Sequence, residues 1–234
     1  MKGPSPARSI RHETVLAGDR LEGRDAGSAG YREVARYVAA RFDAAGLSPA
    51  GTDGFFQPVP LLERCIREQE SSIEIVRGDR TERLQLGRDA YFSTRAPLAP
   101  ELEAEAVFLG YGVRVPQLGH DDFAGLDLKG KIAVTISGMP AGLPPAVEAH
   151  LGSGAERQKA LIEAGVIGTL SIPNPRRSDI PWSRAAGMRL RPARAIAAEG
   201  FAPAGAMRFA AALNPETATP FTTAPWTTPA ESPR

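Results

Sequence analysis

The sequence predicts a mixed α/β (α+β) fold, in which a helical segment precedes a β-rich domain that contains a small α/β layer. Apolar residues recur at helical spacing between residues 31 and 45. Short apolar runs separated by Gly and Pro begin after residue 62, and a strand–helix–strand pattern spans residues 131–172. A chain of 234 residues that is 42% hydrophobic can bury a core. We therefore place the helical segment at residues 1–62 and the β-rich domain at residues 63–215.

Two helices are predicted in the first 62 residues. The first covers residues 5–17 and is followed by Gly18. The second has Ser28 as its N-cap and Gly46 at the C-terminal position that favours left-handed backbone. Its apolar positions are Tyr31, Val34, Ala35, Val38, Phe42 and Ala45. Residues 55–61 are expected to form an edge strand, because their prolines cannot donate to a ladder.

Strands dominate the prediction from residue 63 to residue 215. A hairpin is expected from residues 72–76 and 82–86, joined by a turn at Gly78 and Asp79. Further strands are predicted at residues 90–93, 104–113, 131–137 and 166–172, and helices at residues 156–164 and 205–213. The Thr/Pro/Ala-rich residues 216–234 lack apolar periodicity, which predicts a disordered tail.

Charge and composition exclude several classes of function. Lys and Arg number 28 and Asp and Glu 27, so the net charge of +1 gives no reason to expect a nucleic-acid partner. No run approaches about 18 apolar residues, which excludes a membrane-spanning helix. The N-terminus lacks the apolar region of a secretory signal, so the chain either stays in the cytoplasm or lacks its true N-terminus. The single Cys65 excludes an internal disulfide or a multi-cysteine metal site.

Two segments of the sequence carry a family resemblance. Residues 21–31 read LEGRDAGSAGY and lead into the second predicted helix. This segment resembles the loop that opens the exopeptidase domain of M28-family zinc aminopeptidases. Residues 108–112 (FLGYG) and 120–131 (HDDFAGLDLKGK), followed by residues 159–172, are similar to the protease-associated (PA) domain inserted in that family. The resemblance covers residues 10–215 and implies a zinc-dependent hydrolase that cleaves peptides.

The resemblance implies a role for each part of the chain. Residues 1–62 would be a fragment of the exopeptidase domain, residues 63–215 a PA domain, and residues 216–234 a disordered tail. The zinc-binding remainder is expected to lie outside this chain. The PA domain of the family is non-catalytic and contacts peptide or protein substrates or covers the active-site mouth; the intact enzymes are periplasmic or secreted. The alternative is a stand-alone PA-fold binding or structural protein unrelated to proteolysis.

The candidates for a metal site are His120 and Asp122, which match an H-x-D pattern. A two-zinc peptidase needs two histidines, a bridging carboxylate and a glutamate base. The sequence holds no Glu-Glu dipeptide, and its other histidines are His12 and His150. We therefore expect His120 to lie in a solvated turn, His12 and His150 to lie at the surface, and this chain to hold no zinc and no catalytic residue.

Three other features have expected roles. Cys65 is expected to be a buried or inert thiol, although neighbouring arginines could lower its pKa. Trp182 is either an exposed contact or a core anchor, and we expect the core anchor. The apolar stripe of the helix at residues 31–45 lacks a sheet to pack on if the remainder of the enzyme is absent, so self-association through Val34, Val38 and Phe42 is expected.

Overall fold

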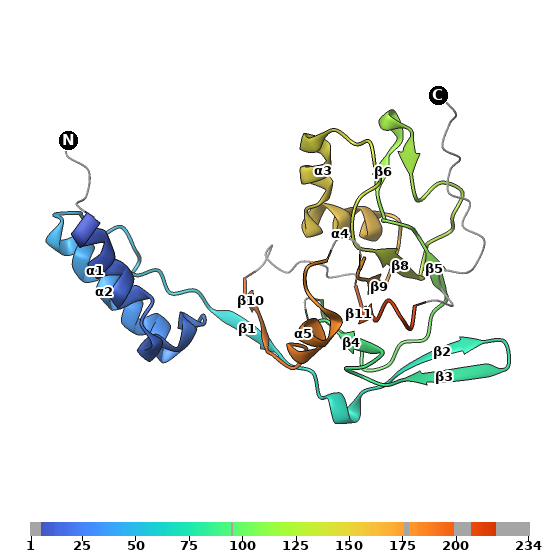
Figure 1. Ribbon diagram of the computed structural model, residues 1–234, viewed down its shortest axis with the longest axis horizontal. Coiled ribbons are helices and arrows are strands. Elements are labelled where there is room, and N and C mark those ends of the chain that lie inside the picture. Colours follow the sequence, from blue (N-terminus) through green and yellow to red (C-terminus); the bar gives the residue numbers. More distant parts are fainter. Residues whose placement is uncertain (1–5, 95, 176–177, 199–206, 219–234) are drawn as a thin grey trace. The chain divides into compact units, whose positions relative to one another are not determined.

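The computed structural model describes residues 6–94, 96–175, 178–198 and 207–218 (Figure 1). It is a mixed α/β structure, and the chain divides into two compact units, Met1–Pro60 and Leu61–Arg234. We call them the helical unit and the sheet unit. No helix in the described part of the chain is both long enough and apolar enough to cross a membrane.

The helical unit contains both helices that the sequence predicts. Its elements are α1 (Pro6–Leu16), a 3-10 helix η1 (Asp19–Arg24) and α2 (Ala29–Ala44). The Ser28 hydroxyl accepts a hydrogen bond from the Tyr31 amide at 3.0 Å, and Gly46 has a φ of 73°, so both predicted ends of α2 are confirmed. His12 is half-buried rather than a surface residue, because its Nδ1 lies 2.7 Å from the Tyr37 hydroxyl and links α1 to α2.

The LEGRDAGSAGY segment has a structural role in the helical unit. Leu21 is buried in η1, and the first turn of α2 packs directly against its backbone. A Cβ atom at Gly30 would overlap the carbonyl of Leu21, so this close approach requires glycine. Glu22 and Arg24 have positive φ values of 49° and 57°, which most side chains avoid.

The edge strand predicted at residues 55–61 is wrong. Asp53 and Phe56 form an isolated bridge, and residues 57–60 are irregular. The first strand, β1 (Leu61–Arg64), begins directly after Pro60. Pro58 and Pro60 have no amide hydrogen to donate, so strand pairing begins at Leu61, directly after Pro60.

A five-stranded sheet forms the centre of the sheet unit, with the order β4-β11-β9-β8-β5. Its strands are β4 (Ala90–Phe92), β5 (Ala106–Phe108), β8 (Ile132–Ile136), β9 (Gly168–Ile172) and β11 (Phe209–Leu213). The last four run parallel, and β4 is an antiparallel edge. Helices α3 (Pro145–Leu151) and α4 (Gly154–Glu163) connect β8 to β9, which confirms the predicted strand–helix–strand layer (Figure 1).

The helix predicted at residues 205–213 is wrong in its described part. Residues 209–213 form β11, which pairs with β9 on one side and with β4 on the other; residues 205 and 206 lie outside the described residues. Alanine favours a helix locally, but here Ala210, Ala211 and Ala212 are buried inside the sheet. Tertiary pairing therefore overrides the local preference.

The remaining elements are short. The hairpin is confirmed: β2 (Ile73–Arg77) and β3 (Arg80–Leu84) pair around Gly78 and Asp79. The strand predicted at residues 104–113 stops at Phe108, because Gly110 and Gly112 turn the chain with φ values of 61° and 66°. The elements that complete the unit are β1, β10 (Ala193–Ile196), β6 (Arg114–Val115), β7 (His120–Asp121), α5 (Trp182–Gly187), η2 (Glu68–Glu70) and η3 (Pro116–Leu118).

Two apolar clusters cover the two faces of the sheet. One contains Ala133 together with Leu161 of α4, and the other contains Val134 together with Ile73 and Leu84 of the hairpin. Adjacent residues of β8 thus point to opposite layers, as strand geometry requires. The sheet is therefore buried between α4 and the β2–β3 hairpin.

Two further expectations concern the end of the chain and Trp182. The predicted tail is ordered at its start, since residues 215–218 form a turn and Ala218 is buried; residues 219–234 lie outside the described residues. Trp182 is half-buried, its ring lies 5.0 Å from that of Tyr91, and its Nε1 donates a hydrogen bond to the Gly87 carbonyl. It anchors α5 beside β4 at the edge of the core.

Candidate functional site

The structure places the metal candidates His120 and Asp122 in a tight loop. His120 lies in β7, and its Nε2 is 3.0 Å from Asp122 Oδ1. The exposed fractions of the two side chains are 21% and 16%. The expected solvated turn is therefore wrong: this loop is half-buried, because β7 pairs with β6 and Phe123 packs into the core beside it.

The carboxylates of this loop hold backbone in place. Asp122 Oδ2 accepts a hydrogen bond from the Val113 amide at 3.0 Å, and Asp121 Oδ1 accepts one from the Phe123 amide at 2.9 Å.

His150 is exposed, with Nε2 3.8 Å from Glu156 Oε2. The residues described here do not fit a zinc site, since no three His, Cys, Asp or Glu side chains in the described part of the chain gather around one point. Cys65 is exposed, which corrects the buried alternative.

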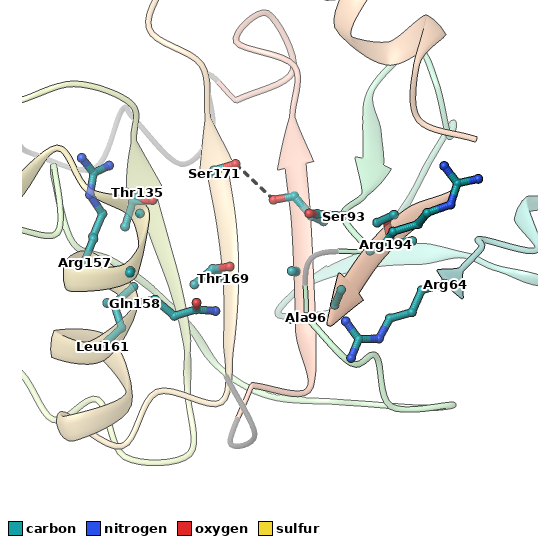
Figure 2. Close-up of a pocket in the computed structure, with 17 residues that line it drawn as sticks. Arg64, Ser93, Ala96, Thr135, Arg157, Gln158, Leu161, Thr169, Ser171 and Arg194 are labelled. Carbon is teal, nitrogen blue, oxygen red and sulfur yellow. Dashed lines mark hydrogen bonds between the residues drawn. The ribbon is translucent and has the colours of Figure 1, made fainter. Parts of the chain in front are cut away.

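The sequence did not indicate a pocket of about 540 Å³ on the α4 face of the sheet (Figure 2). Thr135, Thr169 and Ser171 line it from the sheet: Thr135 and Ser171 lie near the carboxyl ends of β8 and β9, and Thr169 lies near the amino end of β9. In register, Thr169 stands beside the buried Ala133, and Ser171 beside Thr135. On this face of the sheet, Ala133 packs with Leu161 in the apolar cluster, and the hydroxyls of Thr135, Thr169 and Ser171 line the pocket.

Arg157 of α4 lines the pocket with a partly buried guanidinium. Its Nη2 donates a hydrogen bond to the Gly138 carbonyl at 3.3 Å, but its Nε is buried and has no partner among the described residues. Burial lowers the pKa of Arg157 below its usual value, because the charged form loses water. An unmade hydrogen bond of a buried donor costs about 1–3 kcal/mol. Among the described residues, the guanidinium therefore lacks a hydrogen-bond acceptor for Nε and a carboxylate to balance its charge.

Two more arginines line the opposite wall. This wall is the ribbon in which β1 pairs with β10, and it presents Arg64 from one strand and Arg194 from the other. Arg194 Nε donates to Glu63 Oε2 at 2.9 Å, so its charge is already balanced. Figure 2 shows Arg157 on the α4 side of the pocket and both ribbon arginines on the far side.

The chemistry of the pocket is that of recognition. Among the described residues that line it there is no carboxylate, imidazole or thiol. Ser171 donates to the Ala211 carbonyl at 3.4 Å, and no general base is present to activate it or Ser93 as a nucleophile. Arginine, hydroxyl and amide groups around a small apolar floor suit an anionic, hydrogen-bonding ligand.

A second pocket of similar size, about 530 Å³, has the opposite charge. Glu70, Glu74, Glu101 and Glu103 line it together with Arg208. Glu74 lies in β2, Glu70 in η2 just before it, and Glu101 and Glu103 in the segment that precedes β5. No second observation points to a ligand there. The first pocket, which is lined by Arg64, Arg157 and Arg194 and is called the positive pocket from here on, is therefore the stronger candidate.

Comparison with known proteins gives a coarse structural likeness. No family model matches the sequence, and no curated protein matches it. The chain is similar to the aminopeptidase from Aneurinibacillus sp. strain AM-1, with a TM-score of 0.46 and 16% identity over 92% of this chain and 40% of that chain. It is also similar to BSAP, a zinc aminopeptidase from Bacillus subtilis, with a TM-score of 0.39 and 16% identity over 94% of this chain and 42% of that one. The chain thus spans about two fifths of these structures, and scores at this level assign no residue role.

Proposed function

We propose that this chain is the N-terminal and PA-domain part of an M28-type zinc aminopeptidase, and that it serves as a substrate-access or protein-interaction module. On this proposal, residues 1–62 are the exopeptidase fragment and residues 63–215 the PA domain. The observation that carries the proposal is the positive pocket, whose described lining offers groups that recognise a ligand and none that activate water or a nucleophile.

The second motif of the resemblance supports a scaffolding role for the segment around it. Asp127 Oδ1 accepts a hydrogen bond from the Lys129 amide at 3.2 Å, and Gly130 has a φ of 71°. Leu128 is buried, and the Lys131 ammonium lies 3.0 Å from Glu105 Oε2, a pairing that raises the lysine pKa. The GLDLKGK segment is therefore a turn that delivers the chain into β8, as its sequence predicts.

The absence of hydrolysis in this chain is tested with the purified protein. Aminoacyl-anilides are supplied with added zinc, and the dialysed protein is analysed for metal. We expect neither turnover nor stoichiometric zinc, because His120 and Asp122 supply only one imidazole and one carboxylate. The Asp122 carboxylate also already accepts a hydrogen bond from the Val113 amide. Turnover that is lost with a chelator and with His120→Ala, but kept in the exposed-site control His150→Ala, contradicts the proposal.

A second experiment distinguishes the peptidase module from a stand-alone binding protein. The genomic sequence after codon 234 is translated in all three frames. An H-x-D segment and a Glu-Glu pair in that region support membership of a peptidase. Their absence, together with an independent gene start directly downstream, favours the PA-fold protein unrelated to proteolysis.

A further inference from the structure

We propose that the positive pocket binds the carboxylate of a peptide, and that Arg157 is the group that receives it. This inference rests on the proposed function, and it names the part of the substrate that the module would hold. It follows from the state of Arg157, from the make-up of the pocket floor and from the placement of charge on the two walls.

Arg157 needs an anion that the described chain does not supply. A guanidinium carries five N–H donors and a full charge at any physiological pH. Here one donor meets the Gly138 carbonyl and the buried Nε has no partner among the described residues. No described carboxylate forms an ion pair with this side chain. Buried charges in proteins are paired, so a ligand anion is the missing partner. Carboxylates match the planar fork of arginine with two parallel hydrogen bonds.

The size and floor of the pocket favour a peptide over an inorganic ion. A volume of about 540 Å³ lies within the range of small-ligand sites and exceeds what one small anion fills. The small apolar side chains of Ala96 and Ala210 are part of the lining. Gln158 of α4 and Thr169 of β9 add an amide and a hydroxyl (Figure 2). These groups can bond the N–H and C=O of a peptide backbone while the alanines accommodate its side chains.

Charge placement selects which end of a peptide enters. Arg157 stands on one wall, and Arg64, for which the described residues provide no ion pair, stands on the other. A protonated amino terminus is repelled by both arginines, whereas a carboxylate is attracted. An aminopeptidase acts at the amino end of its substrate. A pocket that holds the carboxylate-bearing part would therefore leave the amino end free for cleavage.

The test measures binding of four probes to the full chain by calorimetry at low salt. The probes are acetyl-Ala-Ala-Ala with a free carboxylate, the same peptide as its amide, acetyl-Ala-Glu-Ala amide, and inorganic phosphate. We expect the free acid to bind at least about tenfold tighter than the amide, since a charge-assisted pair is lost in the latter. Binding of the acetyl-Ala-Glu-Ala amide assigns the site to acidic side chains, and failure of that probe assigns it to chain termini.

Variants tie the binding to the pocket. Arg157→Gln should weaken the free acid by about tenfold or more, Arg157→Lys by less, and Arg64→Gln by a smaller factor. Arg80→Gln, on the exposed strand β3, is the matched control and should bind as the unaltered chain does. The thermal transition of each variant is recorded, and Arg64→Gln keeps the test decisive if Arg157→Gln fails to fold.

Each contrary outcome has a distinct meaning. Equal binding of the acid and the amide overturns the carboxylate assignment but leaves the peptide-contact module standing. Binding of phosphate with no peptide bound overturns the inference, as does unchanged affinity in Arg157→Gln. If none of the peptides binds in any form, the inference and the proposed contact with peptides both fall.

Discussion

The helical unit and the sheet unit differ in what stabilises them. Within the described residues 10–60, Leu21 is the one buried side chain, and α2 keeps Tyr31 and Phe42 exposed. The described part of the sheet unit, in contrast, holds separate buried clusters on both faces of its central sheet. The helical unit therefore depends on caps and local contacts, while the sheet unit depends on burial and on pairing between distant strands. The same chain thus offers two different responses to mutation.

The largest effect is expected from a cavity in the sheet. Leu213 of β11 is fully buried, so Leu213→Ala should lower the free energy of unfolding of the sheet unit by about 2–5 kcal/mol. Trp182 fluorescence during urea unfolding, recorded with Trp226→Phe so that Trp182 is the single tryptophan, reports this transition, because its ring packs on Tyr91 in the same unit. Leu47→Ala, at a position that is 53% exposed in the helical unit, is the control and should change stability by about 0.5 kcal/mol or less. Equal effects at both sites would remove the contrast between the units.

The next effect concerns the carboxylate of Asp89, which fastens the turn before β4. It accepts hydrogen bonds from the Gln85 amide and from the Arg88 guanidinium, each at 2.8 Å. The bond from Arg88, followed by the smaller one from Gln85, holds the pKa of Asp89 below its usual value although burial opposes this. Asp89→Asn should cost about 1–3 kcal/mol at pH 7.

The pH dependence of that cost has a defined sign. Because the pKa is lower in the folded state, the stabilisation is complete above the unfolded pKa of about 3.9 and is lost as the pH falls through the folded pKa. The unfolding free energies of the original chain and of Asp89→Asn should therefore differ at pH 5–7 and converge below about pH 4. A difference that stays constant down to pH 2 would show that the charge of Asp89 contributes nothing.

A smaller effect is expected at the N-cap of α2. Ser28→Ala removes the acceptor of the Tyr31 amide and should destabilise the helix by about 1 kcal/mol. Amide hydrogen exchange in the first turn of α2 should accelerate, while exchange in β8 and β9 stays the same. Ser28→Asp, which keeps an acceptor, should restore the protection. Faster exchange in the sheet as well would mean that the two units unfold together.

The smallest change in stability accompanies the proposed self-association of the helical unit. Phe42 is 44% exposed on α2 beside Phe55, so Phe42→Ser should alter monomer stability by less than about 0.5 kcal/mol. Its expected effect is on sedimentation velocity, where dimers of the original chain should disappear. Arg36→Ser, an exposed substitution on the same helix, should leave the dimers in place. A chain that is monomeric at all concentrations contradicts the proposed contact.

The contrast between the units also explains which features sequence reasoning could predict. Both ends of α2 follow from neighbouring residues, Ser28 and Gly46, whose signals act within one turn. The strand β11 could not be predicted in this way, because its alanines favour a helix and become a strand only through β9 and β4.

The positive pocket was missed for the same reason. Its arginines at positions 64, 157 and 194 lie in three separate segments, and no local motif links them. The H-x-D match at His120 and Asp122 was expected to be a solvated turn, whereas in the fold Asp122 is half-buried and accepts a hydrogen bond from the Val113 amide. Local patterns thus indicated the elements that depend on neighbouring residues, such as α2 and the β2–β3 hairpin, and failed for β11 and for the pocket, which depend on distant segments.

The pairing of β1 with β10 has a consequence for how the protein folds during synthesis. Glu63 and Arg194, which face each other in this ribbon, are 131 residues apart in the chain. At a translation rate of about 5–20 residues per second, β1 waits on the order of 10 s for its partner strand to be made. Closing so long a loop is slow, and we expect the ribbon to form after the β8–α4–β9 layer, whose two strands pair across a much shorter stretch of chain. Until then β1 leaves the ribosome as an unpaired strand with Leu61 and Leu62 at its start, so its free backbone groups are open to chaperones and to neighbouring nascent chains.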